Sequence, residues 1–380
     1  MKVIHIIKTS VGATWSFKQI KVLKEQGVEV HVILPNNTGK LYDLFNSINI
    51  PVYICEFDIK NPIKLLNSMI SFKKIVNSIN PDIIHSHFVL TTYIMRIVLF
   101  NDNRPKIFQV PGPLHLEKGP YGKIDKLLSN RNDYWIATCK WTQEKYVELG
   151  IPFSRVFLSF YGTDTSSFIN NGKSKSEYLH TELNLPLDNI LVGLVAYMYP
   201  PKKYLGQSVG LKGHEDFIKA LSIVRLKYPK VKGIIVGKEW GLEKDYENKL
   251  KKMAIDYCGD SIIFLGFRND IPQIYQSIDL AVHPSLSENL GGAVESMLAG
   301  IPTITSNVGG FPDIVKENET GWLVKSQCPD ELAEKIQYVL GNTENSQKIA
   351  LNGFNLVRKE LDVKKTALQV VDIYRKIISN

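Results

Sequence analysis

Residues 283–315 read HPSLSENLGGAVESMLAGIPTITSNVGGFPDIV, and this stretch decides the fold class. An apolar run ends at Ala281 and Val282, a glycine-containing loop follows, and the apolar spacing beyond it predicts a helix from about Gly292 to Ala299. In an open α/β sheet, ligands bind just beyond the carboxyl ends of the strands. The stretch therefore predicts an α/β domain and also the place of its binding site.

The residues at that helix start are suited to an anion. Backbone amides from Leu290 to Ala293 can bind a diphosphate, and Glu295 falls in the first turn, where the helix dipole favours a carboxylate. A carboxylate can also accept hydrogen bonds from both hydroxyls of a ribose. Gly309 and Gly310 predict a second close approach of the backbone. Taken alone, Glu288 and Glu295 could simply stabilise a helix; the combination predicts a site.

The same alternation of strands and helices runs through the chain. The opening predicts a strand at Val3–Ile7, a turn at Gly12, a helix ending at Gln26 and a strand at Val28–Leu34, which together form a βαβ unit. The polar segment 169–189 lacks an apolar period and predicts a linker. We expect two doubly wound α/β domains, at residues 1–175 and 176–363.

The last predicted helix, residues 364–380, has apolar positions that could pack on either domain. In one of these two alternatives the chain returns to the first domain. These positions are Leu368, Val371 and Ile377. Elsewhere the composition is that of a globular protein, with 44% hydrophobic and 22% charged residues. No apolar run approaches the roughly 18 residues of a membrane span. The first strand is too short and polar for a secretory signal, so we expect a cytoplasmic protein.

Charge and cysteine usage limit the function further. Residues 1–185 hold 22 Lys and Arg against 15 Asp and Glu, whereas the remainder holds 24 against 23. Such a basic half suits an anionic partner such as a phospholipid headgroup or a lipid diphosphate, although scattered lysines could equally serve solubility. No nucleic-acid-binding motif is present. The four cysteines lie far apart without CxxC spacing, which argues against a zinc site or a disulfide framework.

The stretch 283–315 resembles the signature of glycosyltransferase family 4, whose members have the GT-B fold. In that signature a serine precedes a glutamate, a glycine loop, a second glutamate opening a helix, a Gly-x-Pro element and a Gly-Gly element. The matching residues here are Ser285, Glu288, Gly291, Glu295, Gly300-Ile301-Pro302 and Gly309-Gly310. The resemblance implies two Rossmann-like domains facing a cleft, with Glu295 on the nucleotide ribose and Glu288 near the reacting carbon of the donor sugar. Six residues separate the two glutamates where the family usually has seven, so the loop is shorter.

Other family elements follow in the expected order. Lys212-Gly213-His214 resembles the Lys-Gly pair whose lysine neutralises the donor diphosphate. A lysine aimed at the departing diphosphate can act as a metal ion would, so neither a metal nor another cofactor is expected. The family usually has an arginine shortly before this lysine. This chain has Ala196-Tyr197-Met198 and then the insertion YPPKKYLGQSVGL, so either Lys202 or Lys203 substitutes, or the donor is held differently.

The first half also carries family-like residues. The turn at Gly12 resembles a glycine loop that faces the donor phosphates and the acceptor, and His115 lies near the place of a family histidine that touches the donor sugar. His85 and His87 match a strand-end Ile-His-x-His pattern, which is structural or lines the acceptor cleft. Tyr161-Gly162-Thr163-Asp164 resembles an Asn-Gly-Val-Asp element that we interpret as interdomain structure.

The resemblance implies a retaining glycosyltransferase that moves a hexose from a UDP- or GDP-linked donor to an acceptor hydroxyl. The expected acceptor is a lipid-linked glycan in bacterial surface polysaccharide synthesis, such as lipopolysaccharide or capsule, reached from the inner face of the cell membrane. Retention could proceed by front-face attack or through a covalent intermediate. The predicted catalytic residues are Glu288, His115 and Lys212, and the predicted donor-binding residues are Gly12, Lys212, Leu290, Gly291, Gly292, Glu295, Gly309 and Gly310.

Two other functions compete with this interpretation. A sugar-nucleotide-binding protein without catalytic activity would have the same donor-site residues. A Rossmann oxidoreductase would need GxGxxG after the first strand and an acidic residue closing the second. The chain has SVGATW and LPNN at these places, which disfavours the oxidoreductase.

Overall fold

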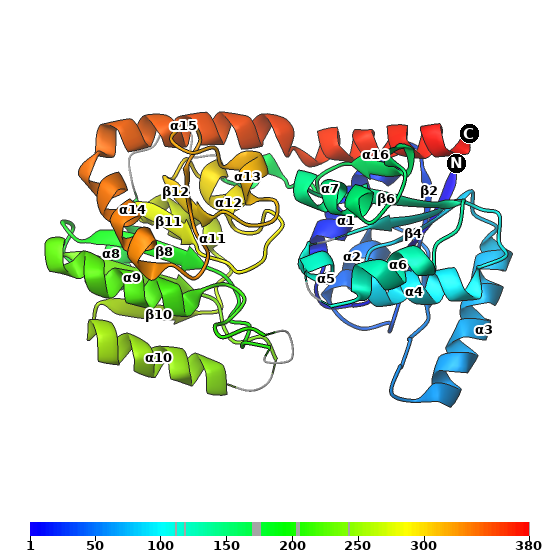
Figure 1. Ribbon diagram of the computed structural model, residues 1–380, viewed down its shortest axis with the longest axis horizontal. Coiled ribbons are helices and arrows are strands. Elements are labelled where there is room, and N and C mark those ends of the chain that lie inside the picture. The colour runs from blue at the N-terminus through cyan, green and yellow to red at the C-terminus, as the bar shows by residue number, and fades with distance from the viewer. Residues whose placement is uncertain (111, 118, 169–175, 203–205, 242–243, 380) are drawn as a thin grey trace. The chain divides into compact units, whose positions relative to one another are not determined.

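The computed structural model describes residues 1–380 except 111, 118, 169–175, 203–205, 242–243 and 380. The chain divides into two compact units, one formed by residues 1–164 with 360–380 and the other by Thr165–Lys359. Each unit is a Rossmann-like domain, a parallel sheet flanked by helices (Figure 1). The sequence placed the first boundary at residues 175 and 176, whereas the structure assigns Thr165 and the residues after it to the second unit.

Over the residues described, the first unit has a sheet of seven parallel strands in the order β3-β2-β1-β4-β5-β6-β7. The strands are β1 (Lys2–Ile6), β2 (Glu29–Leu34), β3 (Val52–Ile54), β4 (Ile83–Ser86), β5 (Lys106–Gln109), β6 (Asp133–Ala137) and β7 (Val156–Leu158). The helices are α1 (Thr14–Glu25), α2 (Lys40–Ser47), α3 (Pro62–Ile79), α4 (Val89–Val98), α5 (Leu114–Glu117), α6 (Tyr121–Leu127), α7 (Lys140–Glu148) and α16 (Val363–Ile378), with a 3₁₀ turn η1 (Phe153–Arg155). The predicted opening βαβ unit is confirmed to within one residue at each end.

The described part of the second unit has six parallel strands in the order β10-β9-β8-β11-β12-β13. They are β8 (Ile190–Val195), β9 (Val231–Val236), β10 (Ile262–Gly266), β11 (Leu280–His283), β12 (Thr303–Ser306) and β13 (Trp322–Val324). The helices are α8 (Tyr178–Glu182), α9 (His214–Lys227), α10 (Asp245–Cys258), α11 (Ile271–Ser277), α12 (Ala293–Leu298), α13 (Phe311–Ile314), α14 (Pro329–Gly341) and α15 (Thr343–Glu360), with a 3₁₀ turn η2 (Thr165–Phe168). Residues 169–175 of the predicted linker 169–189 lie outside the described residues, and α8, in the remainder of it, belongs to this unit.

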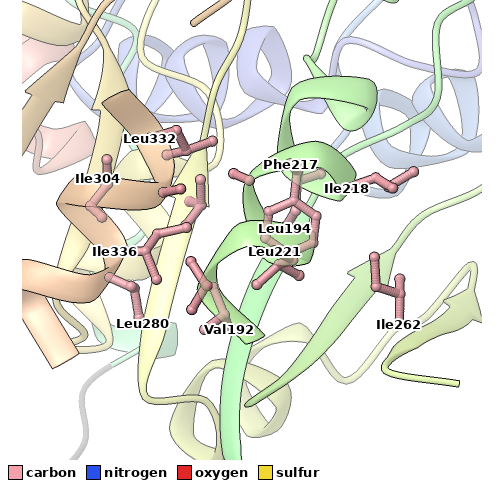
Figure 2. Close-up of a cluster of buried hydrophobic side chains, with 14 of the residues drawn as sticks. Val192, Leu194, Phe217, Ile218, Leu221, Ile262, Leu280, Ile304, Leu332 and Ile336 are labelled. Atoms are coloured by element: carbon pink, nitrogen blue, oxygen red, sulfur yellow. The ribbon is translucent and has the colours of Figure 1, made fainter. Parts of the chain in front are cut away.

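Successive residues of a strand point to opposite faces of the sheet, and helices cover both apolar faces. Within β1, Val3 packs in a cluster with residues of α1 and α16, while the next residue, Ile4, packs with Phe72 and Val76 of α3. A strand buried on both faces must be apolar at successive positions, as parallel strands generally are. In the second unit the main cluster joins Val192 and Leu280 of the sheet to α9 and α14 (Figure 2).

The C-terminal helix α16 packs on the first unit, beside α1. Its buried side chains include Val371 and Ile377 as expected, but Leu368 is exposed, so the predicted face was wrong at that residue. Gly162 makes this docking possible, because a Cβ there would lie 2.5 Å from the Val363 Cα. The backbone of Thr163 pairs with Leu361 and Val363. The Tyr161–Asp164 element thus anchors the returning chain.

Among the helices that the structure describes, none is both long and apolar enough to cross a membrane.

Candidate functional site

A pocket of about 170 Å³ opens in the second unit at the carboxyl ends of β8 and β11. These two strands are neighbours at the point where the strand order reverses, which is the usual ligand position in a doubly wound sheet. The lining comes from the end of β8 and the residues after it, from the loop before α9, and from the segment between β11 and α12. The residues are Leu194, Val195, Ala196, Tyr197, Tyr199, Lys212, His283, Ser285, Glu288 and Gly292.

Lys212 and Glu288 meet in this pocket as an ion pair whose side chains are 18% and 14% exposed. The two loops that carry them are joined by a hydrogen bond of 2.9 Å from the Leu286 amide to the Leu211 carbonyl. Gly213 allows the close approach, because a Cβ there would lie 2.0 Å from the carbonyl oxygen of Pro284. The Lys-Gly pair therefore depends on the glycine to bring the lysine to Glu288.

In the segment after Glu288, Gly291 has left-handed backbone and Gly292 is closely packed against its neighbours. Gly291 has a φ of 44°, and a Cβ on it would lie 2.7 Å from the Glu288 carboxyl carbon. Gly292 caps α12 and lies against the Val195 carbonyl, while the Gly310 amide donates to the Glu288 carbonyl at 3.1 Å. The loop thus brings Glu288, the Gly291-Gly292 pair and the Gly309-Gly310 turn together.

The helix after this loop is shorter than the sequence predicted. α12 spans Ala293–Leu298 instead of reaching from Gly292 to Ala299, and most of its side chains are buried. Glu295 lies in its first turn and is half-buried, and its charge contributes to raising the pKa of Tyr275, whose main cause is burial. The Tyr275 hydroxyl donates to the Gly292 carbonyl at 3.3 Å. Of the described pocket-lining residues, Lys212, Glu288 and Gly292 are predicted ones; Leu290, Gly291, Glu295, Gly309 and Gly310 are not in the lining.

The charges of the pair act on their neighbours. Burial, reinforced by the Lys212 ammonium, lowers the pKa of His214 and of His283 to about 3, so both imidazoles are neutral at pH 7. Burial and the Glu288 carboxylate raise the pKa of Tyr199 to about 12. The pocket thus presents one ammonium, one carboxylate and neutral polar groups, a set able to hold an anion beside a sugar hydroxyl.

An aromatic cluster beside the pocket was missed by the sequence analysis. Tyr197 stands where the family usually has arginine, and its ring centroid lies 5.1 Å from that of Trp240 and 6.4 Å from that of Phe267. Tyr199 lies 5.7 Å from Trp240. Trp240 and Phe267 are about half exposed. The available signal was that an aromatic residue follows each of three adjacent strands, β8, β9 and β10.

Lys202, one of the two expected substitutes for the missing arginine, is not in the described lining of the pocket. Lys202 is exposed; its amide donates to the Gln207 side chain and its carbonyl accepts from the Gln207 amide. Lys203 lies outside the described residues. Lys212 is therefore the lysine that the described part of the chain places at this pocket.

The first unit holds the remaining predicted residues. In the loop before α1 the left-handed backbone belongs to Ala13, at φ 60°, and not to Gly12. His115 is buried, its Nδ1 bonded to the Gly112 carbonyl and its Nε2 to the Tyr146 hydroxyl. Burial lowers its pKa to about 4. Both ring nitrogens are thus engaged within this unit, which favours a structural role, and its contact with a donor sugar stays a prediction.

His85 and His87 form a buried stack with His5. The ligand nitrogens of the three rings lie within 4.8 Å of one another, a spacing that could suggest a metal site. The rings of His5 and His87 are, however, nearly parallel at 14°, and His5 Nδ1 is hydrogen-bonded to His87 Nε2 at 2.8 Å. Because imidazole lone pairs lie in the ring planes, stacked rings do not direct them to a common point. The stack is better explained as hydrogen-bonded core, tied to Tyr374 of α16 and to Tyr161.

Comparison with known protein families agrees with the geometry of this site. The family described as "Glycosyltransferase Family 4" matches residues 16–167, and the family described as "Glycosyl transferases group 1" matches residues 203–355. The two matches together span most of both units. The chain belongs to glycosyltransferase family 4.

Two relatives of this family 4 glycosyltransferase match it over nearly its whole length. It is 25% identical over 380 residues to the capsular polysaccharide biosynthesis glycosyltransferase CapM of Staphylococcus aureus, which covers 93% of this chain and 91% of CapM. It is 24% identical over 388 residues to the UDP-Gal:alpha-D-GlcNAc-diphosphoundecaprenol alpha-1,3-galactosyltransferase of Escherichia coli, covering 94% and 93% of the two chains.

The fold of the family 4 chain also matches that of a solved structure. The crystal structure of Anabaena HepE in complex with UDP superposes with a TM-score of 0.83 at 22% identity, covering 99% of this chain and 100% of HepE. HepE has also been solved with UDP-glucose. The match confirms the GT-B fold with its two Rossmann-like domains.

Proposed function

We propose that this glycosyltransferase transfers a hexose from a nucleoside diphosphate sugar to an acceptor hydroxyl with retention at the anomeric carbon. The observation that carries the proposal is the convergence of Lys212 and Glu288 beside the Gly291-Gly292 loop, at the reversal point of the second sheet. A diphosphate placed there would contact the Lys212 ammonium and the backbone of two glycines, which carry no side chains to block its approach. Family membership supports retention.

The chemistry asks for charge stabilisation at the leaving group. As the bond from the anomeric carbon to the diphosphate oxygen breaks, its electron pair passes to that oxygen. The acceptor oxygen forms the new bond to the anomeric carbon, and its proton passes to the departing diphosphate or to water. Lys212, released from Glu288 by the competing diphosphate, would stabilise the growing negative charge. Glu288 would then accept a hydrogen bond from the donor sugar, which fixes the reacting carbon.

The remaining donor groups can be assigned to the surroundings of the pocket. Glu295 in the first turn of α12 would hold the ribose hydroxyls. The exposed rings of Trp240 and Phe267, backed by Tyr197, offer faces on which a nucleobase can stack. The HepE complexes support UDP as the donor nucleotide. No metal is required in this scheme, because Lys212 takes the place of the cation.

The acceptor follows from the relatives more than from the pocket. CapM is named for capsular polysaccharide biosynthesis, and the Escherichia coli enzyme for a sugar on diphosphoundecaprenol. By analogy, the acceptor here is a lipid-linked glycan used in bacterial polysaccharide synthesis, bound on the first unit near the inner face of the cell membrane.

The proposal is tested by incubating the purified protein with a panel of radiolabelled UDP- and GDP-sugars and lipid-linked acceptors, with EDTA present throughout. We expect transfer with one donor, and α-configuration retained in the product from an α-linked donor. Activity lost in EDTA and restored by Mg²⁺ would contradict the role given to Lys212. Tight donor binding without transfer or hydrolysis for any pair would favour the non-catalytic alternative.

Glu295→Ala is expected to weaken donor binding about tenfold or more. A hydrogen bond to a charged group contributes about 1.5–3 kcal/mol, and each 1.4 kcal/mol corresponds to about tenfold in affinity. Calorimetric titration with the preferred nucleotide sugar measures the change. Glu331→Ala is the matched control, since Glu331 also lies half-buried in the first turn of a helix, α14. A folded Glu295→Ala protein with unchanged donor affinity would remove the ribose assignment.

A further inference from the structure

The helix α3 of the first unit has an apolar half that the unit does not bury. Its buried residues, Phe72, Val76 and Ile79, all lie in its second half. Of residues 62–71 in its first half, none is buried. Figure 1 shows the beginning of α3 (light blue) and the loop before it projecting away from the sheet.

The exposed residues of this half form one stripe. Ile63, Leu66 and Ile70 are 76%, 59% and 49% exposed, and their spacing of three and four residues places them on the same side of the helix. Ile59, in the preceding loop, is exposed as well. Such a row of exposed branched apolar side chains on one helix indicates a surface that another apolar phase covers.

The charged residues of α3 indicate what kind of apolar partner covers this surface. α3 contains Lys64, Lys73 and Lys74 and no acidic residue, and Lys60 precedes it. The nearest acidic side chain before the helix, Asp58, accepts a hydrogen bond from the Lys60 amide. An amphipathic helix with apolar residues on one side and unopposed lysines around them is suited to the headgroup region of an anionic bilayer.

The division of the chain sharpens the charge asymmetry. The first unit, including the returning residues 360–380, holds 24 Lys and Arg against 16 Asp and Glu, and the second unit holds 22 of each. The entire net charge of +8 therefore belongs to the unit that carries α3. Elsewhere in this unit, Lys126 donates to the Leu149 carbonyl, and Lys118 lies outside the described residues.

We propose that the first half of α3 is a membrane-docking element that inserts Ile63, Leu66 and Ile70 into an anionic bilayer while its lysines contact the headgroups. This inference deepens the proposed function, because it takes from that function the idea that the acceptor is bound to a membrane. A docked α3 would hold the first unit at the surface where a lipid-linked acceptor lies.

The test is co-sedimentation of the full chain with phosphatidylcholine vesicles that either contain or lack phosphatidylglycerol. The protein should pellet with the anionic vesicles alone, and about 0.5 M salt should release most of it, because screening is then short-ranged. Ile63→Glu with Leu66→Glu should weaken binding at least about tenfold. The variant no longer buries two apolar side chains in the bilayer, and its two new negative charges offset the attraction of two lysines to anionic lipid.

The matched control is Leu226→Glu with Ile255→Glu, which makes the same chemical change at two exposed apolar residues of α9 and α10 in the second unit. This control should bind anionic vesicles as the unaltered protein does. All variants are compared by thermal unfolding, so that a fold defect is recognised. Lys64→Gln, Lys73→Gln and Lys74→Gln together should weaken binding and reduce its dependence on salt.

Three results would overturn the proposal: equal binding to both vesicle types, unchanged binding of the α3 double variant, or equal loss in the control. A dimer in sedimentation velocity that the α3 variant alone dissociates would assign the stripe to a second copy instead of lipid. Vesicle binding is measured without sugar transfer, so a protein that binds vesicles but transfers no sugar would refute the proposed function and leave this inference standing.

Discussion

Replacing Lys212 with alanine is expected to lower the turnover number about 10²- to 10³-fold while the protein stays folded. Loss of one preorganised group that stabilises transition-state charge typically has this effect, about 2.7–4 kcal/mol. The lysine is held in the pocket by an acidic partner until the diphosphate displaces that partner. The donor KM should rise less than kcat falls, because the charge on the diphosphate grows as the bond breaks.

The comparison needs controls for fold and for general charge loss. Lys227→Ala, at the exposed end of the helix that Lys212 precedes, removes the same charge far along α9 and should leave kcat unchanged. Thermal unfolding of Lys212→Ala checks the cost of leaving Glu288 without its partner. A kcat within about threefold of the unaltered enzyme would exclude Lys212 from leaving-group stabilisation, since the expected loss is at least about 10²-fold.

Acidification is expected to destabilise the protein steeply between pH 6.5 and 4. Burial lowers the pKa of His5, His214 and His283 to about 3 and of His115 to about 4, and holds those of His85 and His87 well below 6.5. These imidazoles are neutral in the folded chain. The unfolded chain takes up protons as the pH falls through 6.5, so the stability they contribute is complete above 6.5 and lost below it.

The size of the effect follows from the number of groups. Each such histidine removes about 1.4 kcal/mol of stability per pH unit once the pH is below 6.5, against a total stability of about 5–15 kcal/mol. Asp216, whose pKa burial raises to about 6, and Asp125, whose pKa burial also raises, oppose the trend because they bind protons in the folded state. The histidines outnumber them.

Urea unfolding at pH 7.5, 6.5, 5.5 and 5.0 measures the loss, and calorimetry in buffers of different ionisation enthalpy counts the protons bound on unfolding. At pH 5.5 we expect an uptake of roughly two or more protons, as the excess of buried histidines over the opposing carboxyls requires. His85→Gln should reduce this uptake by about one. Stability that stays constant from pH 7.5 to 5.0 would mean that the buried imidazoles are protonated in the folded protein.

The sequence determined the architecture of each unit and the polar centre of the candidate pocket. Successive apolar residues such as Val3 and Ile4 require a strand covered on both faces, and the period of the intervening segments requires helices. The pocket residues Lys212, Glu288 and Gly292 were all found from local patterns. Such patterns are readable because a strand end, a glycine turn and a helix start are adjacent in the chain, and their backbone geometry depends on neighbouring residues.

The tertiary structure decided what depends on contacts between distant residues. Lys212 and Glu288 are 76 residues apart, and their pairing depends on a close approach of Gly213 to Pro284 that no local pattern reveals. The return of α16 to the first unit, the engagement of His115 with Tyr146 and the aromatic cluster around Tyr197 arise in the same way. The exposed stripe on α3 is a further case: its apolar residues are visible in the sequence, but only the packing shows that no described part of their unit buries them. Periodicity records which residues share a face, but which faces meet is set by the long-range packing of the whole domain.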